Sequence, residues 1–306
     1  MSQILAIVLP VFLVIGAGFL LRKYGLVGEA WVHVLNSFVY YVSLPAIILI
    51  SFWQIKWTEP GLFKLFLVNV VILVLFTLLL LLVLPLMRLS RPLQAAIIMT
   101  SLVGNTIYMG FPILGPVLNG DYLGGIIGNA TLHLVIGIVI SIMVAEYLVN
   151  RSGKLRNYLF DFLTNPLMIA LGLGIILSFI SLPSWIATVV SKPVSMLAAT
   201  ASPVALFALG AFMHGKFDRP HFNLSLLASV LKLAAFPLFA WALAALFGLG
   251  HVGGQISALT ATMPAAATTF VIADQQNLSR TFVGTTIILS TILSLFSIVA
   301  FLAFLT

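Results

Sequence analysis

Long apolar segments, separated by short stretches of charged, polar, proline and glycine residues, dominate the sequence. Each segment is about 20 residues long, the length that an α-helix needs to cross the hydrocarbon core of a bilayer. The pattern predicts ten membrane-spanning helices joined by short loops. The expected spans are 3–21, 34–52, 63–87, 93–118, 124–148, 160–181, 188–213, 223–248, 254–274 and 281–305.

Composition extends this picture to the whole chain. Of the 306 residues, 62% are hydrophobic and 7% are charged, whereas soluble domains carry about 25% charged residues. The first twenty residues lack the basic start and the small-residue cleavage site of a signal peptide, so we expect a retained first span. The chain has no cysteine, which excludes disulfides and cysteine-based metal sites.

Lysine and arginine are unevenly distributed between the loops. With ten spans, the loops after odd-numbered spans carry ten basic residues and the opposite loops carry three. The positive-inside rule places the richer set in the cytoplasm and both termini outside, as expected for a multi-pass protein of the inner or plasma membrane. Because these residues occur singly or in small groups, the net charge of +7 does not indicate nucleic-acid binding. The two sets are Arg22, Lys23, Arg88, Arg91, Arg151, Lys154, Arg156, Lys216, Arg219 and Arg280, and Lys56, Lys64 and Lys192.

The two halves of the chain resemble each other. "YYVSLPAIILISFWQIK" contains Pro45 and "AATASPVALFALGAFMHGK" contains Pro203, 158 residues later. A helix break is expected at Gly104-Asn105 and another at Pro264, 160 residues after Gly104. Since each half holds five spans, an odd number, the repeats 1–150 and 157–306 should have opposite topology. Paired breaks in inverted repeats are the best sequence pointer to a transporter's binding site.

The first break lies in "LVGNTIYMGFPILGP", where Gly104, Gly110 and Pro112 disfavour a continuous helix. A broken helix inside a membrane survives only if protein or a wet cavity covers its free backbone groups. The N-terminal ends of the resulting half-helices carry partial positive charge, which favours an anion. The alternative is a simple kink or close-packing site, since glycine and proline are common in membrane helices.

The motifs "GNTIYMGFPIL" and "MPAAATTFVIADQQN", with "VSLPAIILISF", "TNPLMIALGLGII" and "SPVALFALGAFM", resemble the auxin efflux carrier family, which includes bacterial members and the plant PIN-type carriers. The resemblance implies an all-α integral membrane protein with ten transmembrane helices, built as two inverted five-helix repeats with broken, crossing helices 4 and 9. It implies a scaffold of helices 1, 2, 6 and 7, and a mobile transport domain of helices 3–5 and 8–10. It also implies elevator-type alternating access, organic anion substrates, and homodimers formed through the scaffold.

By this resemblance, Asn105 matches the crossover asparagine that meets the substrate carboxylate in the plant carriers, and Pro264 matches the second crossover proline. The plant carriers have proline where this chain has Gly104, and the large cytoplasmic loop of many plant members is absent. Small carboxylates such as malonate, malate or lactate, with which the bacterial members are associated, are therefore expected rather than auxin. The expected substrate-binding residues are Gly104, Asn105, Thr106, Tyr108, Asn129, Lys232, Pro264, Ala265 and Thr268, and the expected hinges are Gly104, Gly110, Pro112 and Pro264.

Two ionisable residues fall inside expected spans. Lys232 is the only lysine or arginine well inside one, where a charge costs about 2.5–3.5 kcal/mol on insertion scales. We expect it to add positive potential to the crossover or to take the place of a coupling cation; the alternative is snorkelling to the interface. His133 shares a helix face with Asn129, and either carries a proton or forms a hydrogen bond between helices.

The other motifs leave three functions to compare. The seven acidic residues lie in loops or near span ends, and the sequence has no Walker, HExxH or triad pattern. We therefore expect no enzyme, cofactor or metal centre. The leading interpretation is a secondary transporter of small organic anions, with the bilayer and a second copy of the chain as its other partners. The alternatives are a sodium-coupled carrier similar to the bile-acid symporters, with sodium held by Asn, Thr and backbone oxygens, and a receptor or scaffold without flux.

Overall fold

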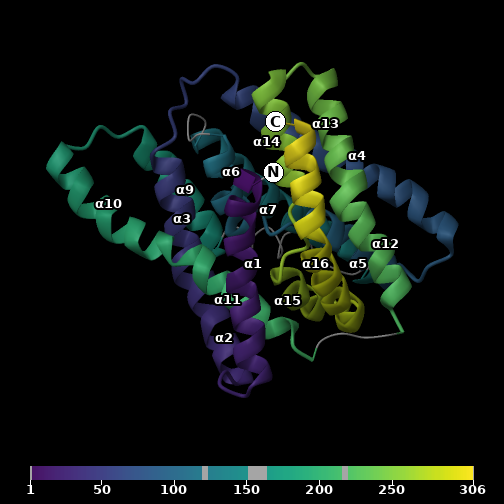
Figure 1. The fold of residues 1–306 in the computed structure, drawn as a ribbon. Coiled ribbons are helices and arrows are strands. Elements are labelled where there is room, and N and C mark those ends of the chain that lie inside the picture. The colour runs from purple at the N-terminus through teal and green to yellow at the C-terminus, as the bar shows by residue number, and fades with distance from the viewer. Residues whose placement is uncertain (1, 119–122, 151–163, 216–219, 306) are drawn as a thin grey trace.

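The computed structural model describes residues 2–118, 123–150, 164–215 and 220–305 (Figure 1). These residues form helices and turns, with a single isolated β-bridge and no regular strand within the described ranges. The all-α prediction is therefore confirmed for this part of the chain. Of the charged residues used above, Asp121, Arg151, Lys154, Arg156, Asp161, Lys216, Asp218 and Arg219 lie outside the described residues.

The helices of the first half follow the predicted order. Three short turns connect or extend them: the π-helical turns η1 (Val39–Ser43) and η4 (Glu146–Asn150), and the 3-10 turn η2 (Leu84–Met87). A further π-helical turn, η3 (Thr106–Gly110), follows the first break. The α-helices are α1 (Ser2–Lys23), α2 (Glu29–Phe38), α3 (Leu44–Trp53), α4 (Leu62–Val83), α5 (Arg91–Leu102), α6 (Phe111–Val117) and α7 (Leu123–Ala145).

The helices of the second half include one more π-helical turn, η5 (Leu231–Ala235), which joins two α-helices into one long element. The α-helices are α9 (Pro166–Ser178), α10 (Ser184–Ala199), α11 (Ala201–Met213), α12 (Phe222–Val230), α13 (Phe236–Leu246), α14 (Gly250–Ala261), α15 (Thr268–Gln275) and α16 (Arg280–Leu305).

Seven helical segments of the described chain are long and apolar enough to cross a membrane. They correspond to seven of the ten expected spans, and they make the chain a multi-pass membrane protein. They are Gln3–Lys23, Glu29–Trp53, Leu62–Met87, Gly124–Val149, Ser184–Met213, Phe222–Leu246 and Arg280–Leu305.

The three remaining segments are interrupted or short. The segment expected at 93–118 is divided into α5 and the continuous η3–α6 helix, and the one expected at 254–274 is divided into α14 and α15. The segment expected at 160–181 is described from residue 164 onward and contains α9. A full count of ten spans therefore stays a prediction.

The two halves of the chain pack closely through small residues. A Cβ atom on Gly18 of α1 would lie 2.0 Å from the carbonyl oxygen of Phe207 in α11. A Cβ on Gly174 of α9 would lie 2.8 Å from the carbonyl oxygen of Leu49 in α3. Glycine is needed at both positions because the backbones touch, as in other membrane helix pairs with small residues at the contact.

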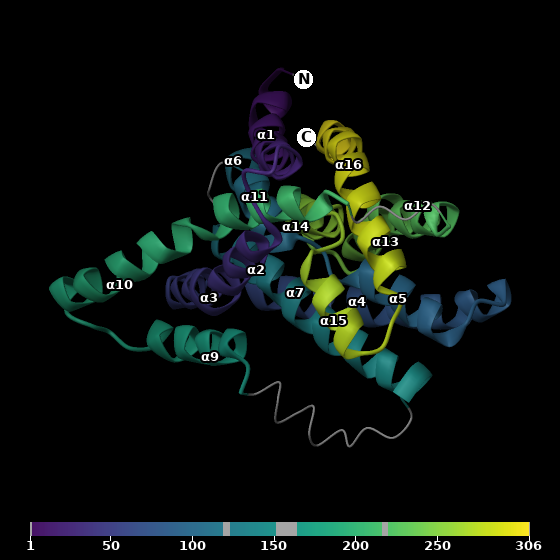
Figure 2. The same ribbon diagram turned by 90° about the horizontal axis from the view of Figure 1, so that it is seen from below.

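The remaining helices form a second group around the interior. α4, α5 and α7 pack against one another. α16 packs against α12 and α14, α14 packs against α13, and these four helices contact the first three. Figure 2 shows α3, α9 and α10 on one side of the molecule and α4, α5, α12 and α13 on the other, with α1 and α11 between them. Both views place the two ends of the chain close together, and Figure 1 shows them at the same end of α1 and α16, which is consistent with an even number of crossings.

Candidate functional site

The two helix breaks meet in the interior and pair through their backbones. α5 ends at Leu102, and α14 ends at Ala261 before the chain passes through Pro264. The backbone N–H of Asn105 donates to the carbonyl oxygen of Pro264 at 2.7 Å, and the N–H of Ala266 donates to that of Val103 at 3.0 Å. Gly104 and Ala265 face each other in the antiparallel bridge. The pairing satisfies backbone groups that would otherwise be costly in a buried, apolar setting.

Neighbouring helices fix this pair of breaks in place. The Thr106 hydroxyl donates to the carbonyl oxygen of Ala130 in α7 at 2.7 Å. The backbone N–H of Ala265 donates to the hydroxyl of Ser290 in α16 at 3.2 Å. A Cβ on Gly110 would lie 3.4 Å from the Met263 side chain, so the end of η3 also touches the second break.

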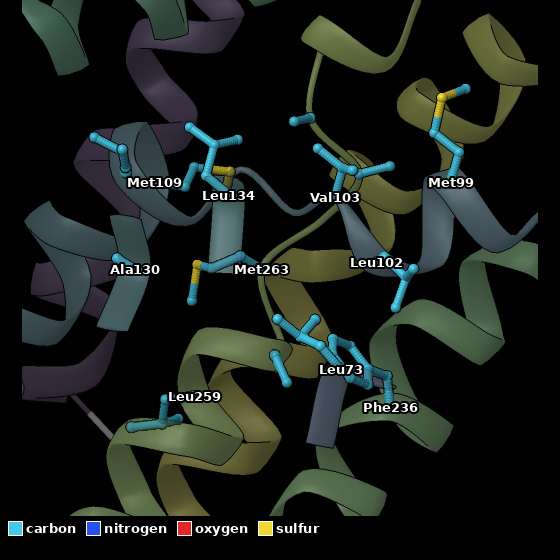
Figure 3. Close-up of a cluster of buried hydrophobic side chains, with 14 of the residues drawn as sticks. Leu73, Met99, Leu102, Val103, Met109, Ala130, Leu134, Phe236, Leu259 and Met263 are labelled. Atoms are coloured by element: carbon cyan, nitrogen blue, oxygen red, sulfur yellow. The ribbon is translucent and has the colours of Figure 1, made fainter. Parts of the chain in front are cut away.

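Apolar side chains from both halves surround the breaks (Figure 3). They come from α4, α5, η3, α7, α13 and α14, and from the broken segments themselves. Such a surrounding excludes water and strengthens electrostatic interactions at the breaks. The labelled residues are Leu73, Met99, Leu102, Val103, Met109, Ala130, Leu134, Phe236, Leu259 and Met263.

Lys232, on η5, lies against the first break. Its side chain is 0% exposed. A Cβ built on Gly104 would lie 2.9 Å from the Lys232 Nζ atom, and Nζ lies 4.7 Å from the centre of the Phe236 ring. The side chain therefore lies within the protein rather than extending to the interface, as snorkelling would require.

The Lys232 Nζ atom has no hydrogen-bond partner among the described residues, and no described carboxylate forms an ion pair with it. Glu29 lies 4.0 Å from Arg22, and Asp274 pairs with Arg280. The other described acidic residues are Glu59, in the turn before α4, and Glu146, at the start of η4. A buried lysine with no anion beside it is an unusual arrangement, because burial strongly penalises an unpaired charge.

A buried hydrogen-bonded chain connects three helices next to this lysine. The Asn69 amide of α4 donates through Nδ2 to the carbonyl oxygen of Leu65 and to the hydroxyl of Ser257 in α14, both at 2.9 Å. Its Oδ1 lies 2.9 Å from Nε2 of His133 in α7. Since both amide N–H groups are used, Oδ1 is the acceptor and His133 Nε2 the donor. The other ring nitrogen, Nδ1, has no partner within the described ranges.

Asn69 and Ser257 were not among the predicted site residues. A signal for Asn69 was present, because it is the single amide in the apolar segment "LFKLFLVNVVILVLF", where a polar side chain is expensive. Asn129, which was predicted, donates through Nδ2 to the Thr260 hydroxyl of α14 at 3.2 Å. Its Oδ1 and that of Asn105 are buried without hydrogen-bond partners in the described part of the chain.

The structure thus brings Gly104, Asn105, Thr106, Lys232, Pro264 and Ala265 together, with Asn129 and His133 on the neighbouring helix. Other predicted residues lie close by in the chain. Tyr108 is half-buried in η3, and Thr268 begins α15. Helical structure continues through Gly110 and Pro112, so the non-helical backbone of the first break is confined to residues 103–105.

A cavity of about 800 Å³ lies elsewhere, lined by residues of α4, α5 and η4 that include Arg91, Gln94, Glu146 and Tyr147. None of the predicted site residues lines it. At the breaks themselves Asn105 and Lys232 are buried. A substrate could therefore reach the breaks only if the surrounding protein moves.

The many apolar helices and the paired breaks in the interior define a multi-pass membrane protein of the transporter class. Comparison with known proteins supports the same class. Residues 3–158 and 155–302 match the family model described as membrane transport protein. The chain belongs to this family, the auxin efflux carrier family that its motifs resemble.

Two archaeal relatives are similar over nearly their whole length. An uncharacterized transporter of Methanocaldococcus jannaschii is 24% identical over 295 residues, which cover 94% of each chain. An uncharacterized transporter of Methanothermobacter thermautotrophicus is 24% identical over 295 residues, which cover 95% of each chain. These comparisons support transport rather than catalysis as the activity.

Proposed function

We propose that this protein is a secondary transporter of small organic carboxylate anions, which bind at the paired breaks. The observation that carries the proposal is the Lys232 amino group, buried against Gly104 without a described carboxylate beside it. An incoming anion would supply the missing partner. Charge-assisted hydrogen bonds of this kind are stronger than neutral ones.

Neutral donors at the first break would complete the anion site. The Asn105 amide can donate without bringing a competing negative charge. Asn105 also stands directly before η3 and α6, a continuous helical stretch, and the first N–H groups of a helix lack intrahelical acceptors. These donors and the partial positive charge of the helix end favour a carboxylate.

The contacts between the halves support two inverted five-helix repeats, residues 1–150 and 157–306. Gly18 touches Phe207, and Gly174 touches Leu49. Gly174 follows Gly18 by 156 residues and Phe207 follows Leu49 by 158, so each contact is the counterpart of the other. The backbone pairing at the breaks has the same reciprocity, because Asn105 bonds to Pro264 and Ala266 bonds to Val103.

An elevator mechanism fits this arrangement. The glycine contacts tie α1 to α11 and α3 to α9, a scaffold in which backbones touch. The breaks are enclosed instead by α4, α7, η5 and α16, the helices of the proposed transport domain. Homodimers would form through the scaffold, where Phe179 and Trp185 are 71% and 69% exposed.

Uptake into proteoliposomes tests the proposed function. Labelled malonate, malate and lactate are offered to liposomes that contain the purified protein, and we expect uptake of at least one above protein-free liposomes. A separate test concerns topology. Because both termini are expected outside, a reporter fused after residue 306 should be active only if it is of a kind that works on the extracytoplasmic side. Absence of flux with every carboxylate, from protein that is folded by its thermal unfolding curve, would favour a receptor or scaffold.

Sodium coupling is a second candidate. Buried amide oxygens of Asn105 and Asn129, which lack partners among the described residues, favour it, because neutral oxygens can hold sodium in unwound transporter helices. Once an anion is bound, the nearby Lys232 ammonium opposes sodium binding by repelling a second cation. Replacing sodium with potassium on both sides of the liposome membrane separates the two: the proposed function predicts unchanged uptake.

A further inference from the structure

The site raises the question of whether Lys232 is charged or neutral. Its side chain is fully buried, and its Nζ atom is without a hydrogen-bond partner in the described residues. The aromatic face of Phe236 offers a cation–π contact, which only partly offsets the loss of hydration. Without an anion next to it, the neutral amine is the less costly form.

The elements packed around η5 provide no compensating charge. Within their described residues, α12 and α13 contain no charged side chain. The charged residue of α5 is Arg91, at the opposite end of that helix from Gly104. The charged residue of α16 is Arg280, at its first position, where it pairs with Asp274. A titratable group, His133 of α7, packs against the same Phe236 ring.

His133 already forms a different hydrogen bond. Its Nε2–H donates to Asn69, whose own N–H groups are both in use. A proton on Nδ1 would create a second cation beside Lys232, with no described carboxylate to balance either charge. The geometry therefore favours Lys232 rather than His133 as the group whose protonation changes when an anion arrives.

We propose that Lys232 is the coupling site of a proton–anion symporter: one proton binds to its Nζ atom with each monoanion, and both cross the membrane together. The proposal rests on the proposed function, since the anion binds at the breaks. The anion stabilises the ammonium form, and by linkage the proton raises anion affinity by the same factor. The loaded site carries no net charge, so it can move through a low-dielectric interior. Transport of a monoanion should then be electroneutral and driven by a pH gradient.

Proton uptake on anion binding is the test. The detergent-solubilised full-length protein is titrated at pH 8 with lactate, a monoanion, and heats are measured in two buffers of different ionisation enthalpy. We expect about one proton taken up per lactate bound, as one-to-one linkage requires. The matched control is Lys192→Met, which removes an exposed lysine on α10 and should leave proton uptake intact.

Three variants locate the proton. Lys232→Arg should bind lactate with no proton uptake, because a guanidinium stays protonated throughout. Lys232→Met should also take up no proton at saturating lactate. This second variant tests the same point if the arginine variant does not fold. His133→Gln retains a donor for Asn69 and should still take up about one proton per bound lactate.

The outcomes separate the coupling from the function on which it rests. Lactate binding without proton uptake by the unmodified protein overturns the coupling and leaves the proposed function standing. Uptake that survives Lys232→Arg but disappears in His133→Gln also overturns it, because the proton site is then His133. No binding of lactate, malate or malonate at all counts against the proposed function itself.

Discussion

The two halves of the molecule meet at the breaks with matching backbones but different side chains. The backbone bonds are reciprocal, from Asn105 to Pro264 and from Ala266 to Val103. Around them, the first half supplies the amides and imidazole of Asn69, Asn105, Asn129 and His133, while the second supplies Lys232. Hydroxyl groups come from both halves. The backbone pairing at the breaks is thus reciprocal but its surroundings are not, because amide and imidazole groups come from one half and the lysine from the other.

The largest expected effect comes from placing a negative charge among the amide groups that the first half supplies at the breaks. Asn105→Asp keeps the side chain's size but sets a carboxylate beside the position expected for the substrate carboxylate. The new carboxylate would also neutralise Lys232. Two like charges about 4 Å apart repel by about 4 kcal/mol at an effective dielectric constant near 20. We expect saturable binding of carboxylates to be lost, with a much smaller loss in Asn105→Ala. Equal affinity of Asn105→Asp and the unmodified protein would place the site elsewhere.

The second-largest effect is expected from removing the positive charge of Lys232, which the second half supplies. Lys232→Met keeps the apolar stem, so the fold should survive. At a separation of about 4 Å and a dielectric constant near 20, the direct attraction is about 4 kcal/mol. Part of it offsets the cost of protonating the buried amine, so the dissociation constant should rise by about tenfold or more. Lys232→Arg should retain much of the affinity. Isothermal titration calorimetry measures both, and an unchanged dissociation constant in folded Lys232→Met protein would remove the lysine from the site.

Breaking the chain of amide and imidazole groups should act on stability more than on affinity. Asn69→Leu removes the acceptor of the His133 Nε2–H, whereas the Ser257 hydroxyl keeps its hydrogen bond to the carbonyl oxygen of Gly253. Each buried group left unsatisfied costs about 1–3 kcal/mol, so the thermal midpoint in detergent should fall by several degrees. Thr77→Val is the matched control on the same helix, since that hydroxyl bonds only within its own helix among the described residues. Equal shifts for the two variants would contradict a special role for the Asn69 network.

The smallest expected effect concerns the backbone at the first break. In Gly104→Ala the new Cβ would lie 2.9 Å from Lys232 Nζ and 3.2 Å from Thr106 Cγ2. The lysine end is flexible and can shift, so we expect a stability change of at most about 1 kcal/mol. The displaced ammonium should weaken anion binding by a few-fold in the same titrations. An affinity unchanged in Gly104→Ala would mean that the position of Nζ is not critical.

The sequence predicted the continuous spans well because their signal is simple. A run of about 20 apolar residues is sufficient to predict a crossing, and seven such segments are present in the described chain. The breaks were also predicted near Gly104 and Pro264, since these residues have a distinct backbone chemistry. Their extent was less predictable: the second break runs from Thr262 to Ala267, and the first ends before η3, with Gly110 and Pro112 within helical structure.

The contacts between distant segments could not be predicted from the pattern. Asn69 meets Ser257, 188 residues away in the chain, and His133, 64 residues away. Whether such a side chain meets another helix or only its own carbonyl depends on the rotation of each helix about its axis. Uniformly apolar helices such as α4 carry little sequence signal for that rotation. The repeat did indicate that the breaks correspond, but not that Lys232 would lie against Gly104.

Counterflow with a carboxylate and its neutral amide is the most direct test of the claim that the paired breaks bind an anion through a buried charge. Proteoliposomes loaded with unlabelled lactate are diluted into labelled lactate, with lactate or lactamide added as competitor. The two competitors have nearly the same size and differ in charge. We predict exchange of labelled lactate that unlabelled lactate suppresses and lactamide does not. Lactamide competing as well as lactate would contradict the account.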